Sequence, residues 1–141
     1  WQIRQRIVSE VSKESSGFDI KNGPGGIKEI EFFVQYHQMK HAADKPDLIV
    51  HDTVSAFQRL KNYGILDGEI AEFLLQSHSF LKSVDTLLRC NEEEFVKDNS
   101  DLLPVMSRFL NMPSPRHVIE RIEETRRKVL EIVQLSYASD H

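Results

Sequence analysis

Residues 67–90 read DGEIAEFLLQSHSFLKSVDTLLRC and form the longest uninterrupted pattern in this sequence of 141 residues. Large apolar side chains recur there three or four positions apart, the spacing that places them on one face of an α-helix. They are Ile70, Phe73, Leu74, Leu81, Val84 and Leu88. Asp67 is a typical residue for the start of such a helix. At about 1.5 Å per residue the helix would be ~35 Å long, the full height of a helical bundle.

The segments on both sides of this helix show the same periodicity. We expect further helices over residues 1–13, 27–42, 52–63, 101–110 and 114–137. Gly64 suits the position just after a helix, and Pro115 suits the first position inside one. Short loops join the predicted helices. The sequence therefore predicts an all-α fold, an antiparallel up-and-down bundle of five to six helices.

Composition excludes several classes of protein. Eighteen Lys and Arg against 22 Asp and Glu give a net charge of −4, which is unlike a general nucleic-acid binder. Cys90 is the single cysteine, so no internal disulfide can form. No apolar run approaches the roughly 18 residues that span a bilayer. We expect a cytoplasmic protein without nucleic-acid or membrane partners, and, because the chain opens on Trp1 rather than Met, a piece of a longer one.

One short segment departs from the helical pattern. Phe18–Lys21 alternates apolar and charged side chains, so in an extended chain Asp19 and Lys21 share one face. Residues 22–26, NGPGG, are of the types that favour a tight turn. The helix that follows would offer free N–H groups to an anion. We therefore divide the chain into residues 1–25, a helix with a short extended segment and a glycine turn, and residues 26–141, the bundle. Without further information, the glycines can be explained by a structural role alone, as the turn that connects an extended segment to a helix.

The segment from residue 19 to residue 35 resembles a family signature. The signature reads Asp, aliphatic, Lys, a few residues, Gly-Gly-Ile, one residue, Asp or Glu, Ile-Glu-Phe, two residues, Gln. It is filled here by Asp19, Ile20, Lys21, Gly25, Gly26, Ile27, Glu29, Ile30, Glu31, Phe32 and Gln35. This pattern is similar to the junction in glutamine synthetase adenylyltransferases, and weaker similarity extends over roughly residues 18–138.

The resemblance implies both an architecture and an activity. In that family a nucleotidyltransferase domain with a Gly-Ser-Asp-x-Asp type metal site precedes a helical bundle. The full enzyme regulates nitrogen metabolism by moving AMP from ATP onto a tyrosine of glutamine synthetase, or by removing it with phosphate. This sequence contains no Gly-Ser-Asp element. The implied protein is therefore the bundle with the seam of a catalytic domain, inactive by itself, with ATP and Mg²⁺ as cofactors of the full enzyme only.

The resemblance also assigns site residues. Asp19 becomes the candidate third carboxylate for Mg²⁺, because that hard ion prefers oxygen ligands. Lys21, Gly25, Gly26 and Glu31 become the candidates next to the nucleotide phosphates. The alternative for Asp19 is a carboxylate that only caps the following turn.

The implied partners are the chain's own nucleotidyltransferase domain, glutamine synthetase and a nitrogen-signalling regulatory protein. Two alternatives stay open: the helical domain of a related uridylyltransferase, and a free-standing helical interaction module without catalysis. The sequence does not assign the adenylylating or the deadenylylating half.

Three further features carry expectations of their own. Glu29 and Glu31 lie about 200° apart around one helix, so they cannot both face one site. The family often places Arg two positions after an acidic residue of the long helix, but here Thr86 and Leu87 follow Asp85. The last helix mixes cations with glutamates, which is typical of a solvated, salt-bridged face; the cations are Arg121, Arg126, Arg127 and Lys128.

Overall fold

The computed structural model describes residues 17–97 and 100–139, and within them every regular element is helical. The α-helices are α2 (Ile27–His41), α3 (Thr53–Asn62), α4 (Gly68–Cys90), α5 (Leu102–Phe109) and α6 (Pro115–Ser139), with a 3₁₀ helix η1 (Pro46–Leu48). The predicted all-α fold is confirmed. None of the helices in the described ranges is long and apolar enough to cross a membrane.

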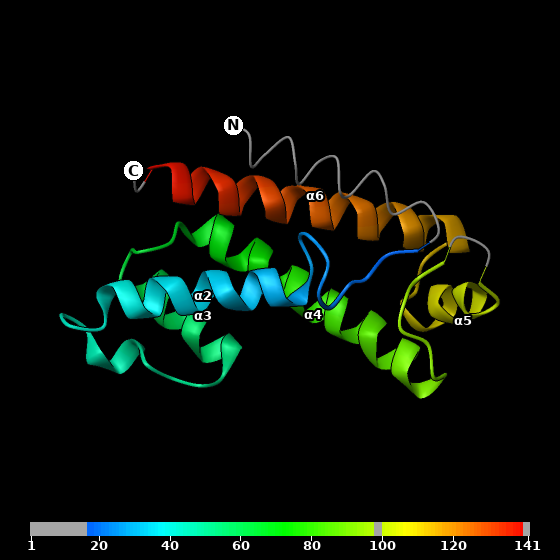
Figure 1. The fold of residues 1–141 in the computed structure, drawn as a ribbon, viewed down its shortest axis with the longest axis horizontal. Helices are drawn as coiled ribbons and strands as arrows, with labels where there is room; N and C mark the ends of the chain where they lie inside the picture. Colours follow the sequence, from blue (N-terminus) through cyan, green and yellow to red (C-terminus); the bar gives the residue numbers. More distant parts are fainter. Residues whose placement is uncertain (1–16, 98–99, 140–141) are drawn as a thin grey trace.

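The helices pack as a bundle around the long helix α4. Figure 1 shows α4 running in the opposite direction to α2 and α6. Helix α3 packs on both α2 and α4, while α5 packs mainly on α6. Neighbours of opposite direction are the arrangement that short connections produce.

Helix ends follow the local signals in the sequence. The carboxylate of Asp52 accepts the Ser55 N–H at 3.0 Å, which satisfies one of the unpaired donors at the start of α3. Gly64 follows the end of α3 with φ +74°, a conformation that glycine adopts without strain. Pro115 occupies the first position of α6. These boundaries were predictable because each depends on a few adjacent residues.

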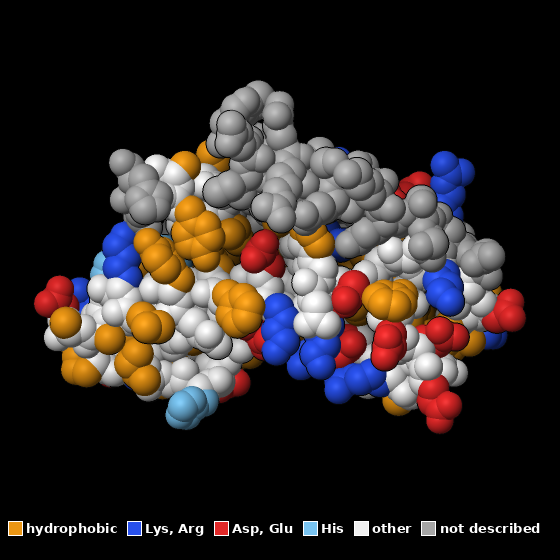
Figure 2. Space-filling view, in the orientation of Figure 1, with side chains coloured by type: hydrophobic (Ala, Val, Ile, Leu, Met, Phe, Trp, Pro, Cys, Tyr) orange, Lys and Arg blue, Asp and Glu red, His pale blue; other side chains and the backbone are white. Residues whose placement is uncertain are grey.

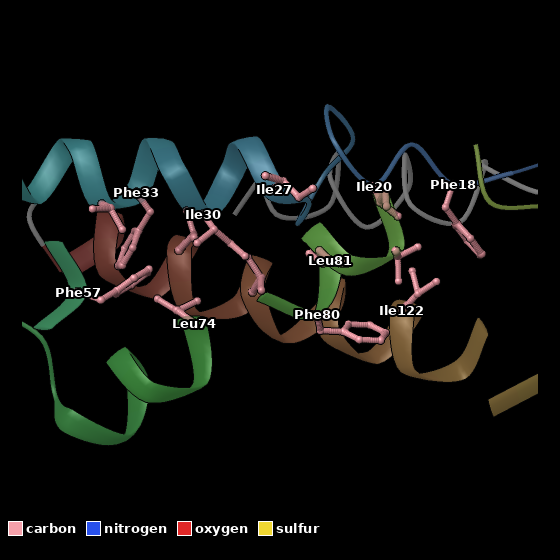
Figure 3. Packing of buried hydrophobic residues seen from close by; sticks show 14 of the residues in the cluster. Phe18, Ile20, Ile27, Ile30, Phe33, Phe57, Leu74, Phe80, Leu81 and Ile122 are labelled. Carbon is pink, nitrogen blue, oxygen red and sulfur yellow. The ribbon is translucent and has the colours of Figure 1, made fainter. Parts of the chain in front are cut away.

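The core lies between α2, α4 and α6, with α3 closing one end. Figure 3 shows Phe33 of α2 and Phe57 of α3 pointing toward each other, and Phe80 of α4 reaching toward Ile122 of α6. The side chain of Gln38 secures η1, because its amide donates to the carbonyls of Leu48 at 2.6 Å and Val50 at 3.0 Å.

The extended segment before α2 is shorter than the alternation predicts. Phe18 exchanges two backbone hydrogen bonds with Val96, at 2.8 and 3.1 Å, in an isolated antiparallel bridge. The backbone already turns at Ile20, so the described chain has no full strand at this place. The predicted helix over residues 1–13 lies outside the described residues.

Candidate functional site

The glycine turn closes a compact loop onto the start of α2. The N–H groups of Ile27 and Lys28 donate to the carbonyls of Ile20 at 2.8 Å and Lys21 at 3.0 Å. The N–H of Gly26 donates to Gly23 O at 3.0 Å. The amides of Gly26, Ile27 and Lys28 therefore bond within the loop and are not free to receive an anion.

Asp19 caps this turn through one of its two carboxylate oxygens. Its Oδ1 accepts the N–H of Asn22 at 2.9 Å and that of Lys21 at 3.2 Å. The side chain is only partly buried, and Oδ2 accepts no hydrogen bond from the described residues. The Lys21 side chain is exposed beside it. The turn therefore holds the carboxylate in one orientation and leaves one oxygen open to a ligand.

Both glycines of the Gly-Gly pair are required by packing. Gly25 has φ +72°, and a Cβ atom placed on it would lie 2.2 Å from the carbonyl oxygen of Arg126 in α6. A Cβ atom on Gly26 would lie 2.3 Å from the carbonyl oxygen of Ile20. Real Cβ atoms do not approach backbone oxygens this closely, so the glycines let the loop touch α6 and itself.

Arg126 corrects the expectation of a solvated face on the last helix. Its side chain is 0% exposed, its Nε donates to Pro24 O at 2.9 Å, and its guanidinium carbon lies 5.4 Å from the ring centroid of Phe18. The residue therefore fastens the glycine loop to α6. The signal was present in the sequence: Arg126 lies four positions after Ile122 and three before Val129, in the middle of the apolar stripe.

Glu29 and Glu31 point to different neighbours, as their helical spacing predicts. Glu29 is half-buried, and burial raises its pKa. The pKa of Tyr137 in α6 is raised mainly by burial and, to a smaller extent, by the charge of Glu29. Glu31 lies 3.4 Å, Oε2 to Nε2, from His78 of α4. Glu31 also lines a groove between α2 and the start of α3, so its contacts lie one turn into α2 and not within the loop of Asp19.

Two polar residues inside the bundle carry structural contacts. Asp85 is buried and its Oδ2 lies 3.0 Å from the Arg89 guanidinium, so its partner is four positions on rather than two. His37 is buried and its Nε2 hydrogen-bonds the Ser136 hydroxyl at 3.2 Å. Within residues 17–97 and 100–139, no three His, Cys, Asp or Glu side chains gather in a way that could hold a metal ion.

Comparison with known proteins matches nearly the whole chain. A family model described as GlnD PII-uridylyltransferase matches residues 2–134. A bifunctional glutamine synthetase adenylyltransferase/adenylyl-removing enzyme of Rhodopseudomonas palustris (strain TIE-1) is 31% identical over 128 residues, which are 89% of this chain and 13% of the relative. The protein of the same name in Thioalkalivibrio sulfidiphilus is 33% identical over 102 residues, 71% of this chain and 10% of the relative. The chain thus spans about one eighth of the length of such relatives.

Proposed function

This chain belongs to the family that the GlnD PII-uridylyltransferase model describes and that includes the glutamine synthetase adenylyltransferases, and on that premise we propose that it is the helical domain of a bifunctional adenylyltransferase. The longer enzyme would move AMP from ATP to a tyrosine of glutamine synthetase, or remove it with phosphate. The observation that carries this proposal is the 31% identity over 89% of the chain to an enzyme of that name.

The contribution of this chain to the reaction would be made through Asp19. The turn fixes the carboxylate through Oδ1, which leaves Oδ2 available. Carboxylate oxygen suits Mg²⁺, but one carboxylate does not hold the ion, so Asp19 fits it only as one ligand of a site shared with another domain. Mg²⁺ bound there would supply charge neutralisation at the transferred phosphoryl group. The exposed ammonium of Lys21 would add positive charge beside the nucleotide phosphates.

The first partner of the bundle would be its own nucleotidyltransferase domain. Phe32 belongs to the signature and is exposed on α2, and Met39 and Ile49 are exposed as well. Figure 2 shows hydrophobic side chains gathered over the end of the molecule that holds α2 and η1, while acidic and basic side chains intermingle elsewhere. An apolar surface of this kind suits a protein interface. Glutamine synthetase and a nitrogen-signalling regulatory protein would be further partners.

The decisive experiment substitutes Asp19→Asn in the full-length protein. Asparagine keeps the oxygen that accepts the two N–H groups of the turn and removes the negative charge. We expect loss of AMP transfer to glutamine synthetase and of its removal, with an unchanged Tm. Asp67→Asn is the matched control, because Asp67 is exposed at the start of α4 and its side chain caps no N–H group.

The outcomes separate the possible assignments. Full activity in the Asp19→Asn enzyme would remove Asp19 from the metal site. The wild-type enzyme is also assayed with UTP and a signalling protein. If it labels that protein with UTP and does not label glutamine synthetase with ATP, the assignment changes from adenylyltransferase to the uridylyltransferase that the family description names.

A further inference from the structure

Helices α4 and α6 face each other across a groove that the signature residues do not reach. Helix α4 contributes Phe73, Gln76, Ser77 and Phe80, and α6 contributes Arg121, Glu124, Thr125 and Lys128. On each helix these positions are three, four and seven residues apart, so each set forms a single stripe. The groove encloses a cavity of about 190 Å³.

Two cations lie over aromatic rings along this groove. The Arg121 guanidinium carbon lies 4.5 Å from the ring centroid of Phe80, and the Lys128 ammonium lies 5.9 Å from that of Phe73. Contact with the face of a ring positions a guanidinium while its N–H edges stay available. Within the described part of the chain, no acceptor receives a hydrogen bond from Arg121. Lys128 already pairs with Glu124 at 2.9 Å.

Two hydroxyls from largely buried residues line the groove. Ser77 is 5% exposed and Thr125 is 8% exposed, and neither hydroxyl bonds to another described residue. Other hydroxyls on α4 behave differently: those of Ser83 and Thr86 donate to the carbonyls four residues earlier, at 3.1 and 2.9 Å. The two hydroxyl oxygens are not among the side-chain atoms of the described residues that are buried without a partner, so they are accessible from the groove. Together with Arg121 they can donate hydrogen bonds to a group from solution.

We propose that this groove binds a small oxyanion, either inorganic phosphate or the phosphate group of a small phosphomonoester. Arg121 and Lys128 supply two positive charges and Glu124 one negative charge, so the lining favours an anion. Hydroxyl and guanidinium donors match phosphate oxygens. The groove is half-open, and its volume of about 190 Å³ is large enough for a phosphate-sized group. The site is independent of Asp19 and of the proposed enzymatic activity.

The test is titration of the 141-residue chain with inorganic phosphate at constant ionic strength, followed by calorimetry and by amide NMR shifts. We expect saturable binding with the largest shifts at Ser77 and Thr125. Arg121→Met, which keeps an apolar contact with Phe80, weakens binding about tenfold or more, the typical loss of a charge-assisted hydrogen bond. Thr125→Val weakens it by a smaller factor, about three- to tenfold. Glycerol phosphate in place of inorganic phosphate distinguishes an esterified ligand from the free ion.

Two variants make the test specific to this groove. Glu124→Gln removes the one negative charge and therefore increases the affinity, a gain that a merely structural role does not produce. Arg127→Met removes a cation from the exposed surface of the same helix, outside the groove, and leaves the affinity unchanged. Thermal melts without phosphate check folding, and Ser77→Ala replaces Thr125→Val if the latter does not fold. Absence of saturation, or equal losses in Arg121→Met and Arg127→Met, would overturn the proposal.

Discussion

Two glycines with nearly the same backbone conformation allow the packing of the glycine loop to be measured. Gly25 has φ +72° and Gly64 has φ +74°. Alanine in this left-handed region costs about 1–2 kcal/mol at either position. At Gly64 nothing lies within 4 Å of the added Cβ, so we expect that cost and no more. At Gly25 the Cβ would lie 2.2 Å from a backbone oxygen of α6, and the forced displacement adds about 1–3 kcal/mol.

The assay is urea unfolding of each variant, followed by circular dichroism. We expect Gly25→Ala to lose about 2–5 kcal/mol of the free energy of unfolding, at least ~1 kcal/mol more than Gly64→Ala loses. Equal m-values would show that both variants unfold from equally compact states. Equal losses in the two variants would refute the reasoning, because the loop would then not depend on close contact with α6.

Three further predictions concern other parts of the bundle. Gln38→Met removes the side-chain donor to the carbonyls of Val50 and of Leu48, which keeps the N–H of Val50, and lowers the free energy of unfolding by about 1–2 kcal/mol, measured by urea unfolding. Burial raises the Glu29 pKa above 4.5, so the folded state binds its proton more tightly. Stability from this group is present below pH 4.5 and lost as pH rises through the folded-state pKa, and Glu29→Gln removes that decline from the curve of Tm against pH. The Asp52 pKa lies below 3.8 because Ser55 donates hydrogen bonds to the carboxylate, so its stabilisation is lost as pH falls through that lower value. Asp52→Ala should therefore lower Tm more at pH 7 than in acid; an equal loss at both would contradict this cause.

Most of the fold was predictable because its determinants are local. A helix start depends on a capping residue such as Asp52 and on a proline such as Pro115, and a helix end on a glycine such as Gly64. The apolar spacing then identifies the buried face. Pairing between distant segments was not predictable in the same way. Phe18 pairs with Val96, 78 positions away, and Val96 lies in a stretch whose sequence is acidic and unpatterned.

The error at Arg126 has a specific physical reason. A cation in a segment rich in alternating charges is normally solvated, and composition favours that interpretation. Position on the helix decides otherwise, because Arg126 lies on the stripe that faces the core. The buried guanidinium is tolerated where a backbone carbonyl accepts its N–H and an aromatic ring covers it. The acceptor, Pro24 O, is 102 positions away, so the sequence gives no direct indication of it.

Apart from Glu29 and Glu31, which are half-buried, the residues of the family signature form two sets that differ in burial. Ile20, Gly25, Gly26, Ile27 and Ile30 are buried, and their side chains or close backbone contacts build the junction between the loop, α2 and α6. Lys21, Phe32 and Gln35 are exposed, and Asp19 is partly so. Within residues 17–97 and 100–139, the side chains of this second set make no hydrogen bond or ion pair apart from those that Asp19 Oδ1 accepts in its turn. A signature kept only for folding would need the first set alone. Under the proposed function the exposed set would lie at the surface shared with the rest of the enzyme, so substitutions there should impair activity without lowering stability.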